Sequence, residues 1–400
     1  MITLPTNKDE NWRYANLRPL AKARPDSVIA VDAARTPIAL PAPLPDYERW
    51  VFVDGRFESA LSSNSADSCA SLLDVSEGGE AFAQLLDSAI ASEGVDFALA
   101  RVNASRGTKV LQVAVPDGAR AKLEVTFVAT AAGAAGTSYP RVQVHAGRNA
   151  QLQLVERHIS AGGNDSAVNA AFDLALRADS SVDHCRLQNL HDAASGFDTL
   201  LAHVGDRASY RLRTVTLGGL TSRSTILVKL AGRAARCELT AASIANGIQT
   251  HDMFAEIEHA GADTVTRELY RGIATDRGKL GFNGKIVVRE SAPGSDSEQS
   301  LKTLLTGIGA EAAARPQLEI HTDRVRAQHG ATTGKLDEQM LFYLLSRGID
   351  RRQAQTLLQW AFIEDAVSRL PCAELRAEIE QLIAAQLNEV SALEGLLGKP

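Results

Sequence analysis

The sequence predicts a mainly β fold: a β-helix core of stacked parallel coils between a mixed N-terminal part and a helical C-terminal part. Two observations predict the core. Short runs with apolar residues at alternate positions fill the middle of the chain, and a turn pattern recurs there at steps of 26 to 32 residues. Further on, the apolar spacing becomes that of helices. We therefore expect three domains: 1–107 (mixed or helical), 108–335 (the β-helix) and 336–400 (helical).

The composition is that of a folded globular protein. The chain has 400 residues, of which 45% are hydrophobic and 22% are charged. A net charge of −6 argues against a general nucleic-acid-binding protein. No run approaches the roughly 20 apolar residues that a membrane span requires, and the first residues lack the apolar run of a signal peptide. We therefore expect a cytoplasmic protein with neither a membrane nor a nucleic acid as partner.

The N-terminal part contains one clear strand and one helical pattern. The run Trp-Val-Phe-Val at 50–53 ends at Asp54 and Gly55, which predicts a strand and a turn. The proline-rich segment 37–45 cannot be helical. A helix is expected over 76–94, because apolar residues recur there at helical spacing.

The β core carries a repeated unit, Gly-x-x-Ala-x-apolar-x-apolar. Its copies begin at Gly118, Gly147, Gly205 and Gly232, with degenerate copies at Asp179 and Gly261. A period of this length is typical of a solenoid, in which each coil stacks on the next. The unit therefore predicts one interior row of small side chains, made of Ala121, Ala150, Ala208 and Ala235.

A series of antiparallel hairpins, folded into a sandwich or barrel, would also show short alternating strands. The regular spacing favours the solenoid, and most of the turns lack the Asn-Gly pair that is typical of tight hairpins. One such pair does occur, Asn283-Gly284, and it predicts a local hairpin or bulge. From the pattern alone both folds remain open.

Three helices are expected after Leu336. The first has an apolar stripe of Leu336, Met340, Leu341 and Leu344 and ends at Gly348. The second begins near Asp350, ends before Pro371 and is expected to bury Ala354, Leu357, Leu358, Ala361 and Phe362. The third carries Leu375, Ile379, Leu382, Ile383, Leu387, Val390 and Leu393. This surplus of apolar positions indicates either a partner surface or packing onto the end of the solenoid.

Signatures of catalysis are scarce. The segment 330–335 resembles a phosphate loop, but it has three residues between its glycines instead of four, and Leu336 replaces the required Ser or Thr. The four cysteines are far apart, so neither a disulfide framework nor a structural zinc site is expected. The nine histidines are core or surface residues by default, although stacking of coils could bring distant ones together into a metal site.

The chain resembles a known family in several segments. The longest are Arg-Pro-Gln-Leu-Glu-Ile at 315–320, the run 329–339 and the run 341–349, and shorter ones lie at 270–272 and 282–286. These segments are similar to the C-terminal signature of the SufB/SufD family, the scaffold subunits of the SUF iron–sulfur cluster assembly system. The Trp-Arg-Tyr start at 12–14 and the short chain resemble the SufD branch.

This resemblance implies a right-handed parallel β-helix and a complex with a SufB-like subunit and a SufC-like ABC ATPase. The ATPase would dock on the C-terminal helices, 336–397. The resemblance also implies that His329 is a transient iron or Fe–S ligand at the partner interface, with no cofactor firmly bound by this chain alone. Ala327 stands where the family often has Cys, so the sulfur ligands would come from the partner. A homodimer is a further expectation for the isolated chain.

Two functions from different classes follow. The first is a non-enzymatic scaffold subunit for Fe–S cluster assembly, which supports iron acquisition and cluster formation. The second is a β-helix carbohydrate-active enzyme, which would carry clustered carboxylates on one face of the solenoid. Such enzymes are usually exported, and the sequence shows no export signal.

Overall fold

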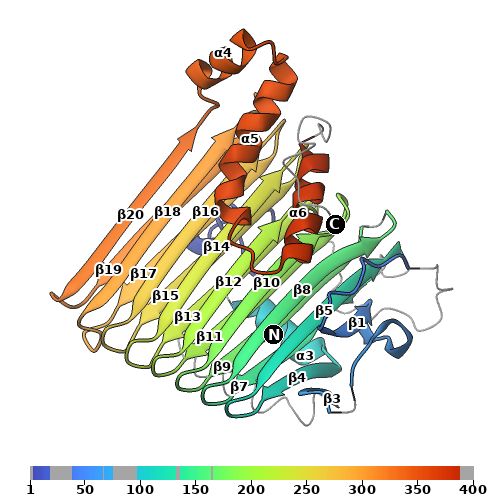
Figure 1. Ribbon diagram of the computed structural model, residues 1–400, viewed down its shortest axis with the longest axis vertical. Coiled ribbons are helices and arrows are strands. Elements are labelled where there is room, and N and C mark those ends of the chain that lie inside the picture. Colours follow the sequence, from blue (N-terminus) through green and yellow to red (C-terminus); the bar gives the residue numbers. More distant parts are fainter. Residues whose placement is uncertain are drawn as a thin grey trace.

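The computed structural model describes residues 3–18, 38–65, 67–74, 97–131, 136–163 and 165–387. Its core is a parallel β-solenoid of about seven turns, with helices at the C-terminus (Figure 1). Each turn contributes one strand to each of two ten-stranded sheets. The strands on either side of Gly147 or Gly232 therefore lie in different sheets. The predicted β-helix is confirmed, and the hairpin alternative is wrong.

The first sheet, called sheet A, carries the candidate site at one edge. Its strands pair in the order β2 (Arg56–Phe57), β1 (Glu48–Val53), β5 (Arg120–Thr130), β8 (Gln151–Ala161), β10 (Ser181–Asn189), β12 (Ser209–Thr216), β14 (Arg236–Ala245), β16 (Val265–Ala274), β18 (Ser295–Leu305) and β20 (Val325–Gly334). The strand β1 contains the run Trp-Val-Phe-Val that the sequence predicted. Among the described strands of this sheet, β1 and β2 are the one pair that runs antiparallel.

The second sheet, called sheet B, lies opposite. Its order is β19 (Glu311–Ile320), β17 (Lys279–Val288), β15 (Thr250–His259), β13 (Thr221–Leu230), β11 (Ser195–Val204), β9 (Ala167–Leu176), β7 (Arg141–Ala146), β4 (Lys109–Val115) and β3 (Ala70–Asp74), with β6 (Thr137–Ser138) beside β9. The apolar residues at alternate positions of both sheets meet between them in one continuous core.

A row of small side chains lines the corner where each coil enters sheet A. Ala150, Ala208 and Ala235 lie in this row, as predicted, and Ser180 fills the place between the first two. The residue before each member has a positive φ, for example Asn149 and Ala234. The chain therefore turns sharply at this point and leaves room for only a small side chain inside.

The prediction for Ala121 is wrong. Ala121 pairs with Leu152, and Ala119 is the residue that lies beside Ala150. In that coil the glycine itself has the positive φ, because Gly118 occupies the place of Asn149 and not that of Gly147. The pattern was therefore displaced by two residues in its first copy.

The hairpin or bulge predicted at Asn283-Gly284 is also wrong. Both residues lie in the middle of β17, which pairs in register with β15 and β19. The glycine is required by packing and not by a turn. A Cβ atom on Gly284 would come within 2.9 Å of side chains from the opposite sheet.

The N-terminal part packs against the outer face of sheet B. The short helix η1 (Glu10–Trp12) places Trp12 against Phe197 and against Leu99 of α3 (Ala98–Arg106). The guanidinium of Arg223 lies 4.2 Å from the centre of the Trp12 ring. A second short helix, η2 (Ser59–Leu61), follows β2. The helix expected over 76–94 lies outside the described residues.

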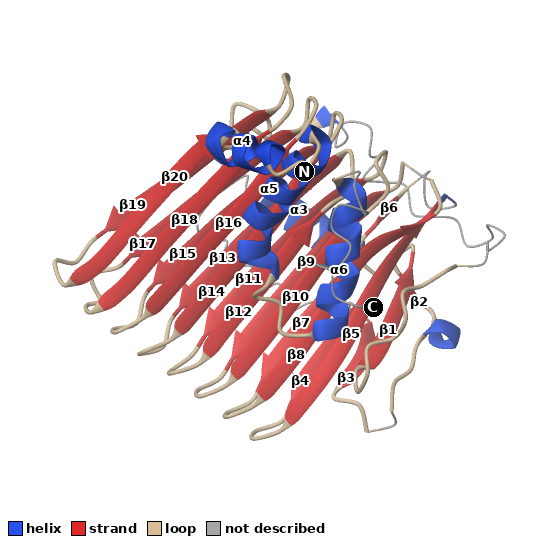
Figure 2. Cartoon of the chain, turned by 45° about the horizontal axis from the view of Figure 1, so that its top comes forward, coloured by secondary structure: helices blue, strands red, loops and turns tan. Residues whose placement is uncertain are grey.

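Three C-terminal helices follow β20: α4 (Glu338–Ser346), α5 (Arg351–Val367) and α6 (Ala373–Gln386). Figure 2 shows α5 and α6 across the outer face of sheet A. The boundaries at Gly348 and Asp350 are as predicted, since Gly348 has a positive φ and the Asp350 carboxylate caps α5. None of the helices in the described ranges is long and apolar enough to cross a membrane.

The predicted apolar stripes are partly wrong. Met340 is 59% exposed on α4, and Ala361 is exposed on α5. Ala354 is buried, as predicted, and the other buried residues of α5 are Thr356, Trp360, Ile363, Ala366 and Val367. Trp360, Ile363, Ala366 and Val367 belong to the apolar cluster that covers sheet A, and the predicted Leu357 and Phe362 are partly buried against it.

Candidate functional site

His329 lies on β20, the last strand of sheet A. Side chains in register with His329 face the solenoid interior on each strand of sheet A from β8 to β20. This row consists of Leu154, His184, Leu212, Leu239, Glu268, Gln299 and His329. The other members of this row are buried, whereas His329 is exposed. The described part of the chain places no further strand beside β20. His329 therefore stands at the open end of the solenoid interior.

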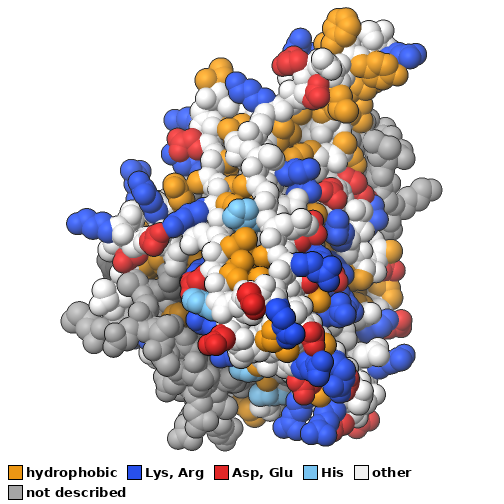
Figure 3. Space-filling view, turned by 90° about the vertical axis from the view of Figure 1, so that its left-hand side faces the viewer, with side chains coloured by type: hydrophobic (Ala, Val, Ile, Leu, Met, Phe, Trp, Pro, Cys, Tyr) orange, Lys and Arg blue, Asp and Glu red, His pale blue; other side chains and the backbone are white. Residues whose placement is uncertain are grey.

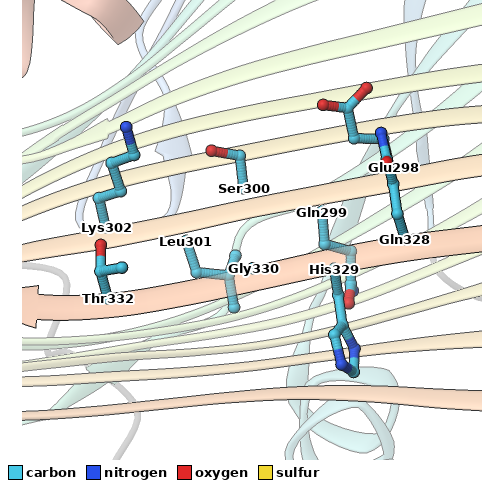
Figure 4. Close-up of a pocket in the computed structure, with 9 residues that line it drawn as sticks. All are labelled: Glu298, Gln299, Ser300, Leu301, Lys302, Gln328, His329, Gly330 and Thr332. Atoms are coloured by element: carbon cyan, nitrogen blue, oxygen red, sulfur yellow. The ribbon is translucent and has the colours of Figure 1, made fainter.

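A pocket of about 300 Å³ lies at this end (Figure 4). It is lined by Glu298, Gln299, Ser300, Leu301, Lys302, Gln328, His329, Gly330 and Thr332. All of these residues come from the neighbouring strands β18 and β20. The pocket thus follows the edge of sheet A, where a ligand or a partner chain can reach both His329 and the unpaired edge of β20.

Two buried polar side chains lie directly behind His329. The amide Nε2 of Gln299 donates a hydrogen bond of 2.5 Å to Oε2 of Glu268. The two side chains are only 2% and 3% exposed, and the Oε1 atom of each has no hydrogen-bond partner in the described structure. Burial raises the pKa of Glu268 to about 7, an effect that the hydrogen bond from Gln299 opposes.

Ala327 also faces inward on the last coil. It pairs with Ser297, and the same row continues through Thr266 to Cys237. Cys237 therefore faces inward as well, but it lies three strands away from Ala327. Burial raises its pKa, as do the nearby carboxylates of Glu268 and Glu238.

The other cysteines also favour the protonated thiol. Burial raises the pKa of Cys185 to about 12, and it raises the pKa values of Cys69 and Cys372 as well. All four thiols are free. The chain therefore brings no thiolate to His329.

A second polar cluster lies deeper in the solenoid. The Glu156 carboxylate accepts hydrogen bonds from His158, from His184 at 2.8 Å and from Arg186 at 2.9 Å. Arg186 also pairs with Asp198. These partners hold the pKa of Glu156 well below its usual range against the effect of burial.

The deeper cluster is separate from His329. In the row that holds His184 and His329, Leu212 and Leu239 lie between His184 and Glu268. Stacking of the coils does bring His158 and His184 together, but both form hydrogen bonds with the Glu156 carboxylate. The described residues contain no group of three or more His, Cys, Asp or Glu side chains that could hold a metal ion.

The C-terminal helices use most of their apolar surface within the chain. Leu375, Ile379 and Ile383 of α6 are buried against sheet A, together with Cys185 and Leu217. Val390 and Leu393 lie outside the described residues. The helices pack on the face of the solenoid, whereas the sequence suggested its end.

Ion pairs fix the two long helices on sheet A. Arg271 of β16 pairs with Asp365 of α5 at 2.6 Å, and Arg157 of β8 pairs with Glu378 of α6 at 2.8 Å. Both arginines are buried and both acids are partly exposed.

Among the described C-terminal helices, the large apolar side chains that are exposed lie on α4. Met340, Phe342 and Tyr343 are 59%, 72% and 56% exposed. Figure 3 looks at the open end of the solenoid and shows hydrophobic side chains on the part that projects beyond it. The sequence had placed Met340 in a buried stripe, and it did not single out Phe342 or Tyr343 as exposed.

Sequence reasoning found His329 through the family resemblance and missed Glu268, Gln299 and Gly284 as its neighbours. The signal for them was present in the register of the repeat. Thr264 and Ser295 occupy the small-residue row in their coils. Glu268 and Gln299 follow them by four residues and therefore lie in register with each other.

Comparison with known proteins shows the family of this chain. A family model described as "SUF system FeS cluster assembly, SufBD core domain" matches residues 127–362. The iron-sulfur cluster assembly protein SufD of Escherichia coli (strain K12) is 28% identical over 393 residues, which cover 96% of this chain and 89% of that protein. SufBD family proteins of Synechocystis and Mycobacterium leprae are each 25% identical and cover 96% and 98% of this chain, and 88% and 92% of their own lengths. The predicted resemblance is confirmed: the chain belongs to the SufBD family of iron–sulfur cluster assembly proteins.

Proposed function

We propose that this chain is a non-enzymatic scaffold subunit that supports iron acquisition and cluster formation at its junction with a SufB-like subunit, and that it docks an ABC-type ATPase. The observation that carries the proposal is the position of His329. It is an imidazole at the open end of the solenoid, beside an unpaired strand edge. Iron and the nascent cluster are cargo in this proposal, and the chain alone holds no cluster firmly.

The open coil supports a junction with another β subunit. Side chains of β19 and β20 are exposed or half-exposed along their whole lengths, whereas the equivalent strands of earlier coils are largely buried. An unpaired strand edge is a template for pairing with another chain. A SufB-like subunit with a similar open coil would cover both edges. In the isolated chain, a second copy would pair through the same edges and form a homodimer.

The chemistry of the donor set suits a transient site. A neutral imidazole binds iron, and incoming sulfide or thiolate ligands can replace it. The chain supplies no thiolate at this point, since Ala327 is the inward neighbour of His329 on the strand and all four thiols have raised pKa values. The sulfur ligands must therefore come from the partner.

The ATPase is proposed to dock on the C-terminal helical part, 336–397. The chain lacks a phosphate loop of its own, so ATP hydrolysis requires a separate subunit. The apolar faces of α5 and α6 are largely used within the chain, whereas α4 presents Met340, Phe342 and Tyr343 to solvent. We therefore centre the docking surface on α4.

The test of the iron site is His329→Ala in the assembled complex with a SufB-like subunit and the ATPase. The measurement is iron and acid-labile sulfide per complex, with thermal melting as the control for folding. We expect both contents to fall while the complex still forms, because truncating one exposed side chain changes stability little. The matched control is His321→Ala, which removes another exposed histidine at the same end of the molecule. Unchanged iron and sulfide in a complex that forms normally would contradict the proposed role of His329.

The test of ATPase docking is the double substitution Phe342→Ser and Tyr343→Ser. We expect the ATPase to be lost from the purified complex, while the SufB-like subunit is retained. The control is Ile248→Ser, which removes an apolar side chain that is 58% exposed in the turn between β14 and β15. Full recovery of the ATPase with the double variant would place the docking surface elsewhere.

The alternative of a carbohydrate-active enzyme gains no support. It requires a pair of carboxylates that are free to act on a sugar. The outward carboxylate of Asp183 is held by Arg211 and Arg213, and that of Asp296 by Arg267. Membership of the SufBD family also favours iron–sulfur cluster assembly.

A further inference from the structure

We propose that Gln299, held in place by Glu268, is a positioning residue that accepts a hydrogen bond from one ring nitrogen of His329. The other ring nitrogen is thereby presented to iron at the mouth of the pocket. This inference deepens the proposed function and rests on it, because it concerns the same site. Its first part, the orientation of the imidazole, can be tested in the chain without iron.

The register of sheet A places the three side chains in one inward row on consecutive strands. Glu268 of β16 pairs with Gln299 of β18, and Gln299 pairs with His329 of β20. Adjacent strands are about 4.8 Å apart, so each side chain reaches the next one. Gln299 and His329 also line the same pocket and lie side by side in Figure 4.

Glu268 determines which end of the Gln299 amide is left for His329. The amide has two N–H donors and one carbonyl acceptor. Its nitrogen is fixed on Glu268 by the hydrogen bond of 2.5 Å. The carbonyl Oε1 is buried without a partner in the described structure. A buried acceptor without a hydrogen bond destabilises the fold, so a hydrogen bond from His329 to this oxygen would be favourable.

The ring of His329 can supply that donor. A neutral imidazole carries one N–H and one bare nitrogen, and a metal binds the bare nitrogen. The hydrogen bond made by the N–H determines which nitrogen is bare and how the ring is oriented. An acceptor behind the ring, toward the closed part of the solenoid, therefore leaves the bare nitrogen facing the open end.

The opposite sheet leaves space for this pair. A Cβ atom on Gly284 would lie 2.9 Å from Nε2 of Gln299 and 2.9 Å from Oε2 of Glu268. A side chain at this place in β17 would therefore displace the amide and the carboxyl from these positions. This observation is independent of the register and of the hydrogen bond.

The experiment compares Gln299→Leu with the wild-type chain in two measurements. The first is the tautomer of His329, read by long-range ¹H–¹⁵N correlation in the full-length chain with labelled histidine and assigned by its absence in His329→Ala. We expect one tautomer in the wild type and a mixture in Gln299→Leu. The second is anaerobic titration of Fe²⁺ into the assembled complex, where we expect the affinity to fall about 10- to 100-fold.

Variants at Glu268 test whether this residue holds the Gln299 amide in place. They also provide a second test if the Gln299→Leu chain does not fold. Glu268→Gln keeps an acceptor for the Gln299 amide, so the tautomer and the affinity should be preserved. Glu268→Leu removes the acceptor, so both should change as in Gln299→Leu. The matched control is Ser297→Ala, which alters a buried inward side chain two positions away on β18.

The outcomes separate this inference from the proposed function. If Gln299→Leu and Glu268→Leu keep a single His329 tautomer and full Fe²⁺ affinity, while His329→Ala loses affinity, the positioning role is wrong and the site stands. If His329→Ala binds Fe²⁺ as well as the wild type, the proposed iron site is wrong. In that case the tautomer measurement still decides whether Gln299 orients the ring.

Discussion

Replacing Glu268 with Gln should make the chain more stable above neutral pH and flatten its dependence on pH. Burial raises the pKa of Glu268 from the usual 4.5 to about 7. A tenfold change in proton affinity corresponds to about 1.4 kcal/mol, so ionisation in the folded state costs the fold about 3 kcal/mol. The native chain binds more protons at this residue than the unfolded chain, so the unfolding free energy falls as the pH rises through this window.

The assay is urea denaturation between pH 5 and pH 8, followed by tryptophan fluorescence and by circular dichroism. Coincident transitions would justify two-state analysis. Between pH 5 and pH 8 the wild type should lose about 2.5 kcal/mol more than Glu268→Gln, because part of the full effect lies below pH 5. Other groups titrate equally in both chains, and their contributions cancel in the difference. Parallel profiles for the two chains would refute the reasoning, because they would mean that Glu268 is already ionised in the fold at pH 5 or has access to water.

Three further predictions concern the buried contacts of the fold. Glu156→Gln leaves Arg186 and two histidines without their shared carboxylate. Urea denaturation should show that this variant is less stable by about 3–5 kcal/mol. The control Glu238→Gln, on the exposed face, should change the stability little. Arg271→Ala breaks the ion pair with Asp365 and should speed hydrogen exchange in α5, whereas Arg267→Ala should not. Trp12→Ala removes a fully buried ring and should expose the segment 3–18 to proteolysis. The control is Tyr14→Ala, because the side chain of Tyr14 is 48% exposed. Equal cleavage of both variants would contradict a docking role for Trp12.

The repeat was visible in the sequence because the turns constrain it. A residue with positive φ must precede a small side chain in each coil, as at Asn149 and Ala150. The exact register was harder to predict, because glycine occurs at two positions of the turn. One position, that of Gly147, lies three residues before the small side chain, and the other, that of Asn149, directly precedes it. Gly118 fills the second, and the first copy of the unit was therefore displaced.

The candidate site was only partly predictable for a physical reason. His329 came from the family resemblance, which says nothing about neighbours that are distant in sequence. Glu268 and Gln299 become its neighbours only after each coil has stacked on the next. Gly284 was misread because an Asn-Gly pair is typical of a hairpin, whereas here the absence of a side chain serves the opposite sheet. The exposure of Met340, Phe342 and Tyr343 was not predictable either, because helical periodicity indicates an apolar face but not which element covers it.

The two ends of the solenoid are built differently, and this difference links the fold to the proposed function. A terminal repeat has to cover the core that the next repeat would have covered. At the N-terminal end, β2 and β3 pair antiparallel with their neighbours and close both sheets. At the C-terminal end, α5 and α6 lie across the face of sheet A, and no described strand pairs with the outer edge of β19 or β20. At this same end the inward row changes from leucine to Glu268, Gln299 and His329. A row that stays apolar would suit a core closed by the chain itself, whereas polar side chains leading to an open edge suit a site completed by another subunit.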